Sequence, residues 1–129
     1  MESPKEKEAF SVVKRARSFT HAVRGIRIFI ATTPNAWIHI LLGISAIGLG
    51  FSFHITQSEW LAIILSIGLV FVAEAVNTAV EIDINLTCSE YHPYARDTKD
   101  VAAGAVLIAS TIALAIGLIV FLPYFIPFF

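Results

Sequence analysis

The stretch WLAIILSIGLVFVAEAVNTAVEIDINL, residues 60–86, decides the fold. Its first half has the apolar composition of a membrane-spanning helix, and its second half adds polar side chains while keeping a helical pattern. At about 100° per residue, four polar side chains fall within an arc of about 80° on one helix face. They are Glu74, Asn77, Glu81 and Asn85. Each ionisable group at membrane depth costs roughly 3 kcal/mol on insertion, so this polar face indicates a functional site.

The polar face carries two carboxylates and two carboxamides, so it is rich in oxygen. Oxygen ligands suit a hard divalent cation such as Mg²⁺. A carboxylate also takes a proton from a substrate that lies within hydrogen-bond reach. The residues alone therefore indicate a site that binds a cation and abstracts a proton.

Charged residues are confined to separate blocks of the chain. Lys, Arg, Asp and Glu are absent from 28–58 and again after Asp100, and hydrophobic residues make up 57% of the 129 residues. Such segregation is typical of a polytopic membrane protein. We therefore predict an all-α integral membrane protein that forms a single domain over residues 1–129. Cys88 is the one cysteine, which excludes a disulfide framework and a cysteine-based zinc cluster.

Four helical segments are expected. Apolar residues spaced by four and three from Val12 to Ile30, with basic residues on another side, predict an amphipathic helix on an anionic membrane surface. This helix is either an ordinary juxtamembrane helix or a part of the site, and the sequence leaves both open. The expected boundaries are about 10–32 for the surface helix and about 36–54, 59–86 and 99–122 for three membrane spans. The segment MESPKEKEAF (1–10) has no apolar core after its charges, so we expect no signal peptide.

The basic residues predict the orientation in the membrane. Every Lys and Arg lies either in the N-terminal segment up to Arg27 or in the polar loop expected at 86–99. Three spans place these two segments on the same side, and the positive-inside rule makes that side cytoplasmic. We therefore expect a multi-pass protein of the bacterial cytoplasmic (inner) membrane, with its N-terminus in the cytoplasm and its C-terminus outside.

The third span carries a small residue every four positions, at Ala105, Ala109, Ala113 and Gly117. Such a strip lets helices approach closely, either within one subunit or between subunits. Three spans give little room to bury a polar face. We therefore expect an oligomer whose interfaces shelter the acids of the polar face.

The loop expected at 86–99 carries candidates for phosphate binding. The nucleotide signatures GxxxxGK[ST] and GxGxxG are absent, so phosphates need other donors. Arg96 and Lys99 lie near the expected start of the third span, where a helix N-terminus attracts anions, although they also fit simple positive-inside anchoring. Asp97 and Asp100 are spaced to cap that helix. Together with the polar face, this loop favours phosphoryl transfer at the membrane surface.

Two motifs resemble those of a known family. The segment A-E-A-V-N-T-A-V-E (73–81), followed by E-Y-H-P-Y-A-R-D-T-K-D-V-A-A-G-A-V-L (90–107), closely resembles the prokaryotic diacylglycerol kinase family, which includes undecaprenol kinases. Gly25 in the surface helix and the Asn35-x-x-x-His39 spacing at the start of the first span extend the resemblance to nearly the whole chain.

The resemblance implies a homotrimer of three-span subunits, each with a surface helix, and composite sites between neighbouring subunits. It implies transfer of a phosphoryl group from ATP, with Mg²⁺, to a membrane lipid alcohol, either undecaprenol or diacylglycerol. No nucleic acid partner is expected. The run A-A-G-A-V-L (102–107) is more similar to undecaprenol kinases and tilts the expectation that way.

The resemblance also implies roles for individual residues. Glu74 matches the catalytic base that takes the lipid hydroxyl proton, and Asn77 lies beside it. Glu81 matches a metal ligand, with Glu74 as a second candidate ligand. The residues expected to bind the nucleotide are Gly25, Glu81, Asn85, Glu90, His92, Arg96, Lys99 and Asp100.

Two positions depart from the family pattern. Many members carry a metal-binding Glu eight residues after the surface-helix glycine, where this chain has Thr33. Many also carry an Asp four residues after Glu81, where this chain has Asn85. Asp83 lies roughly opposite Glu74 on the helix and does not simply replace that acid.

These departures leave a second hypothesis beside the lipid kinase. A catalytically weakened member could act as a membrane structural or partner-binding subunit. The retained carboxylates at 74 and 81 favour the enzyme, because a structural protein has no use for intramembrane acids. A proton- or ion-conducting transporter fits least, because 61–73 offers only Ser66 as a polar residue.

Overall fold

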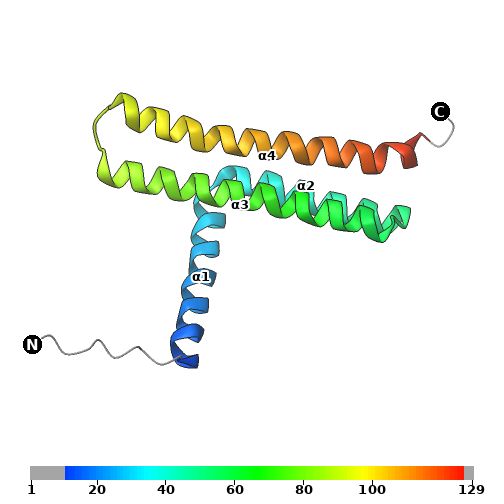
Figure 1. Cartoon of the computed structure of the whole chain (residues 1–129), viewed down its shortest axis with the longest axis horizontal. Helices are drawn as coiled ribbons and strands as arrows, with labels where there is room; N and C mark the ends of the chain where they lie inside the picture. Colours follow the sequence, from blue (N-terminus) through cyan, green and yellow to red (C-terminus); the bar gives the residue numbers. More distant parts are fainter. Residues whose placement is uncertain (1–10, 127–129) are drawn as a thin grey trace, which may run out of the picture.

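The described part of the chain folds into four α-helices. A computed structural model describes residues 11–126, and its helices are α1 (Val12–Thr32), α2 (Pro34–Phe53), α3 (Gln57–Thr87) and α4 (Pro93–Phe125). The all-α prediction is confirmed. Helices α2, α3 and α4 run side by side, and α1 leaves this bundle at a steep angle (Figure 1). The expectations for residues 1–10 lie outside the described residues.

The three predicted membrane spans are confirmed as long apolar helices. In their most apolar 18-residue windows, α2, α3 and α4 have mean hydropathies of 1.8, 2.1 and 2.8, and their lengths are 20, 31 and 33 residues. About 20 apolar residues cross the hydrocarbon layer of a membrane. Helix α2 matches that length, whereas α3 and α4 exceed it. Because α2 begins beside the middle of α3 (Figure 1), the surplus length of α3 and α4 extends past α2 at the α3–α4 loop.

A short break at Thr33 and Pro34 turns the chain from α1 into α2. Thr33 has extended backbone, because the following proline disfavours helical geometry at that position. Pro34 then occupies the first turn of α2, where the backbone N–H that it lacks has no partner anyway. Phe29 is the buried residue of α1, near this break. The placement of α1 on a membrane surface stays a prediction.

The connection between α3 and α4 is shorter than the sequence predicted. A polar loop was expected over 86–99, whereas α3 continues to Thr87 and α4 begins at Pro93. Proline in the first turn does not break a helix. The His92 side chain caps the start of α4, because its Nδ1 accepts a hydrogen bond from the Tyr94 backbone N–H at 3.2 Å.

Residues expected at the start of the third span therefore lie inside α4. Asp97 and Asp100 come after its first turn, so the prediction that they cap this helix is wrong. Only the first four N–H groups of a helix lack intrahelical partners. Lys99 comes later than these, so it acts through its own charge and not through the helix N-terminus.

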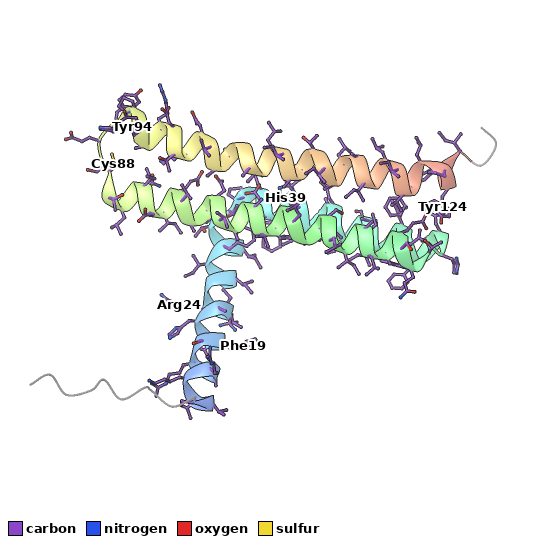
Figure 2. All side chains as sticks on the ribbon, in the orientation of Figure 1. Phe19, Arg24, His39, Cys88, Tyr94 and Tyr124 are labelled. Carbon is purple, nitrogen blue, oxygen red and sulfur yellow. The ribbon has the colours of Figure 1, made fainter. Side chains whose placement is uncertain are left out.

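At the end of the bundle opposite the α3–α4 loop, the Glu59 carboxylate caps α3 and accepts a hydrogen bond from α4. Thr56 and Glu59 form a capping box at the start of α3, with N–H to oxygen distances of 2.7 and 3.3 Å. The Tyr124 hydroxyl, near the end of α4, donates to Glu59 Oε2 at 2.7 Å (Figure 2). Helix α4 continues past Pro123 to Phe125, beyond the expected end at 122, and thereby brings this tyrosine to α3. Apolar side chains pack around the contact, namely Ile55, Ile63, Val120 and Phe121.

Candidate functional site

Glu74 is the most deeply buried polar side chain of the site. It lies on α3 and is 1% exposed. Its Oε1 is 3.0 Å from Nε2 of His39 on α2, which is 17% exposed. Figure 2 shows His39 beside α3, near the junction of α1 and α2. The acid expected to act as the base is therefore inside the protein, in contact with a second ionisable side chain.

A second polar contact joins the same two segments. Thr33 Oγ1 lies 2.6 Å from Thr78 Oγ1, and both side chains are buried. Residues 33, 36 and 39 are each three apart, so they share one side of the chain as it enters α2. Thr78 follows Glu74 by one helical turn on α3. The start of α2 thus presents Thr33, Ala36 and His39 to one stripe of α3.

The side-chain oxygen of Asn77 is a hydrogen-bond acceptor that no donor of the described residues contacts. Its Oδ1 is the one buried side-chain polar atom with no hydrogen-bond partner in the part of the chain that the structure describes. A buried polar atom left unpaired costs about 1–3 kcal/mol. Asn77 is three residues from Glu74, on the same face of α3. A hydroxyl brought to Glu74 would therefore find a second acceptor beside it.

Past the start of α2, in the direction of the α3–α4 loop, the polar face of α3 faces α4. Lys99 Nζ donates to Asn85 Oδ1 at 2.6 Å. The structure thus joins two residues that the sequence nominated separately. A carboxamide does not neutralise the ammonium group, so Lys99 keeps its charge for an anion. Glu81, one turn before Asn85, is exposed.

The α3–α4 loop forms a hollow of about 320 Å³. Six of the predicted nucleotide-binding residues line it, namely Asn85, Glu90, His92, Arg96, Lys99 and Asp100. The Arg96 guanidinium is oriented by Asp97 Oδ1 at 2.8 Å and by the Tyr91 hydroxyl at 3.2 Å. Arg96 thus forms an exposed ion pair with Asp97, whereas the Lys99 ammonium has a neutral partner and is the group of this hollow best suited to a phosphate.

Gly25 is not brought to this hollow within one chain. It lies on α1, and a Cβ added to it would meet nothing within 4 Å. Its neighbour Arg24 lies on the part of α1 that projects away from α3 and α4 (Figure 2). The expected contact of Gly25 with a nucleotide stays a prediction.

The donors of the site fit Mg²⁺ that arrives with phosphates. Among residues 11–126, no three His, Cys, Asp or Glu side chains are grouped closely enough to hold a metal. Glu74 and Glu81 are seven residues apart, which is about 10 Å along a helix axis. Mg²⁺ is often held by one or two carboxylates together with substrate phosphates and waters. The exposed Glu81 carboxylate suits that arrangement, whereas an all-protein cage is not formed by the described residues.

His39 enters the sequence-based prediction only through the Asn35-x-x-x-His39 spacing, without a role in the site. The signal was nevertheless present, because a histidine inside an otherwise apolar span is a functional candidate by default. The contact between Thr33 and Thr78 was missed as well. It had no comparable signal, since threonine is common in membrane helices and satisfies its hydroxyl locally.

Three long apolar helices, a buried acid and a polar hollow at the α3–α4 loop define a class, small multi-pass membrane proteins with a polar site. Residues 20–121 match the family described as prokaryotic diacylglycerol kinase. The chain belongs to this family of membrane lipid kinases, which confirms the resemblance.

Relatives with assigned activities carry two different names. The chain is 39% identical to an undecaprenol kinase of Bacillus subtilis over 83% of this chain and 87% of that protein. It is 34% identical to a diacylglycerol kinase of Synechocystis over 93% and 70% of the respective lengths. A diacylglycerol kinase of Helicobacter pylori is 28% identical over 77% and 83%.

Proposed function

We propose that this chain transfers the γ-phosphoryl group of ATP to the hydroxyl of undecaprenol, at the cytoplasmic surface of a bacterial inner membrane. The observation that carries the proposal is the buried Glu74 carboxylate with the unpaired Asn77 Oδ1 beside it on α3. Diacylglycerol is the alternative acceptor. Undecaprenol is favoured by the 39% identity to the relative of that name, against 34% and 28% for the two diacylglycerol kinases.

The chain's residues divide the reaction between them. Glu74 takes the proton of the lipid hydroxyl, and Asn77 lies beside it on the same helix face and shapes the site. The hydroxyl oxygen forms a bond to the γ-phosphorus while the bond to the β–γ bridging oxygen breaks, which releases ADP. Lys99 and Arg96 offset the charge of the phosphates, and these electrostatic contacts supply most of the rate in a loose transition state. Glu81 would hold Mg²⁺ together with the nucleotide, and Glu74 is the second candidate ligand. When bound, Mg²⁺ would neutralise charge on the transferring group.

The position of α1 supports a reaction at the membrane surface. Helix α1 meets the bundle at the contact between Thr33 and Thr78, one turn from Glu74. With α1 on the cytoplasmic surface, as its basic side suggests, Glu74 lies at the depth of that surface. The loop hollow then lies outside the hydrocarbon, where a water-soluble nucleotide reaches it. The same arrangement places the C-terminus on the outer side.

The assembly is part of the proposal. We propose a homotrimer in which neighbouring subunits share the sites and shelter the polar face. Only Ala109 of the small-residue strip on α4 is buried within the chain, and a Cβ added to Gly117 would meet nothing within 4 Å. Ala105 is exposed, whereas Ala113 and Gly117 are part-buried and line the cleft between α2, α3 and α4. A helix of another subunit that packs at this cleft would approach α4 closely along the strip.

One observation favours the second candidate, a catalytically weakened subunit. The Thr33 hydroxyl, at the position where many members carry a metal-binding acid, is already engaged with Thr78. No negative charge is offered at that position. The enzyme is nevertheless the stronger proposal, because a buried carboxylate is retained at Glu74.

The first test measures turnover directly. Purified protein in detergent micelles, given ATP and Mg²⁺, should release ADP with undecaprenol faster than with diacylglycerol. Glu74→Gln should lower turnover by at least about 10²-fold, because a general base contributes 10²–10⁴-fold. Glu59→Gln is the matched control, since glutamine also completes a capping box and this residue is remote from the site. Equal turnover of the Glu74→Gln variant and the unsubstituted protein would remove Glu74 from the reaction.

A further inference from the structure

A histidine inside an apolar span holds the acid proposed as the base. His39 Nε2 and Glu74 Oε1 are 3.0 Å apart and come from different helices, α2 and α3. No other hydrogen bond to the Glu74 carboxylate is present among residues 11–126. The orientation of this carboxylate therefore depends on one imidazole nitrogen.

The chemistry of the two groups fixes which atom donates. An ionised carboxylate has acceptor oxygens and no hydrogen to give. Glu74 must be ionised to accept a proton from a substrate, so the hydrogen of this contact lies on His39 Nε2. The contact thus selects the form of the imidazole in which Nε2 carries a hydrogen.

The surroundings of His39 are mostly apolar. It lines one end of an apolar cleft of about 470 Å³ between α2, α3 and α4. The neighbouring lining residues include Gly43, Phe71 and Ser110. A neutral imidazole brings an N–H donor into such surroundings at a lower desolvation cost than an ammonium group.

We propose that His39 is a positioning residue for phosphoryl transfer, an inference that rests on the proposed role of Glu74 as the base. The Nε2–H group pins Oε1, and the geometry of the carboxylate then sets the direction of Oε2. In the proposed reaction, this second oxygen receives the proton of the lipid hydroxyl. A reacting group displaced by about 1 Å loses up to about 10²-fold in rate, so a pinned carboxylate matters for turnover rather than for binding.

The kinetic test compares two substitutions. His39→Leu removes the donor and should lower kcat about 10- to 100-fold, with the KM for ATP changed less than about 3-fold. His39→Gln places an amide N–H near the Nε2 position and should recover most of the loss. Tyr124→Phe is the matched control, because it also removes one hydrogen bond between helices but lies at the other end of the bundle. Its kcat should stay at the level of the unsubstituted protein.

A double-mutant cycle separates positioning from general stability. If His39 acts through Glu74, then adding His39→Leu to Glu74→Gln should cause no further loss of the residual turnover. The same fold-loss in both backgrounds, or a Gln variant as slow as the Leu variant, would overturn the proposal. A Glu74→Gln variant with full turnover would instead overturn the proposed function. Full turnover of His39→Leu, together with an inactive Glu74→Gln, would overturn this inference alone.

A spectroscopic test does not depend on turnover. In protein labelled with ¹⁵N at histidine, the ring nitrogens of His39 should show that Nε2 carries the hydrogen. Substituting Glu74→Ala should shift the Nε2 resonance, whereas Glu59→Gln should not. A His39 ring with its hydrogen on Nδ1 alone would overturn the proposal, because Nε2 would then have nothing to donate.

Discussion

Neutral hydrogen-bonding groups stand at two positions where acids are common in related proteins. Thr33 is bonded to Thr78 at 2.6 Å, and Asn85 accepts from Lys99 at 2.6 Å. All four polar groups are therefore satisfied without negative charge. In the proposed reaction, the nucleotide would therefore meet a more positive site, and Mg²⁺ would have one carboxylate ligand fewer.

Restoring an acid at position 33 tests how the metal is held. Thr33→Glu should lower the Mg²⁺ concentration for half-maximal turnover by about tenfold, which corresponds to ~1.4 kcal/mol. The added carboxylate would supply an oxygen ligand next to the polar face. The measurement is ADP release at increasing Mg²⁺. Thr78→Val is the control, because it breaks the same hydroxyl contact without adding charge. An unchanged Mg²⁺ requirement in Thr33→Glu would mean that the metal is bound elsewhere.

The residues of the candidate site could be proposed from the sequence one by one, but their pairings could not. An acid at depth inside an apolar helix is informative by itself, so Glu74 was identified from its position alone. The His39 contact depends on how α2 lies against α3, and these residues are 35 positions apart. Asn85 and Lys99 show the same limit, since each was nominated separately and only the α3–α4 hairpin joins them.

At the scale of helices, the apolar spans were recovered and their ends were less accurate. Hydrophobic length predicts a span because the bilayer thickness is fixed. It does not detect a polar helical segment that precedes the apolar stretch, so residues 93–98 are predicted as loop, whereas they form the start of α4. The His92 cap and Pro93 in the first turn explain the early start, and both signals are local.

The packing of α2 on the start of α3 gives a prediction at the same scale. A Cβ added to Gly50 would lie 2.7 Å from the Trp60 ring and 3.1 Å from Ile55. Gly50→Ala should therefore destabilise the protein by about 1–3 kcal/mol through overpacking. Gly48→Ala is the matched control, because it lies on the same helix with nothing within 4 Å and should gain up to ~1 kcal/mol in helix propensity. Thermal unfolding in micelles measures both, and equal stabilities would contradict the tight contact.

At the scale of the whole molecule, the proposed base and the proposed phosphate-binding residues of one chain lie far apart. Glu74 and Asn85 are eleven residues apart on α3, or about 16 Å along the helix axis. Reacting atoms in a productive complex lie only about 3–3.5 Å apart. Phosphates held by Lys99 beside Asn85 are therefore far from a hydroxyl held at Glu74 of the same chain. A neighbouring subunit that supplies one of the two residues would close the distance, which agrees with the proposed shared sites.

Mixing two inactive variants tests this sharing. Glu74→Gln and Lys99→Ala should each abolish most turnover, because one removes the base and the other a phosphate ligand. In randomly mixed trimers with sites between subunits, roughly a quarter of the sites would combine an intact Glu74 with an intact Lys99 from a neighbour. Turnover of the coexpressed mixture should therefore rise to about a quarter of the unsubstituted level. If both residues of a site come from one chain, every site in the mixture stays defective and turnover remains at the sum of the two variants. Crosslinking of the same samples in membranes should yield trimers, and monomers alone would contradict the assembly on which the sharing depends.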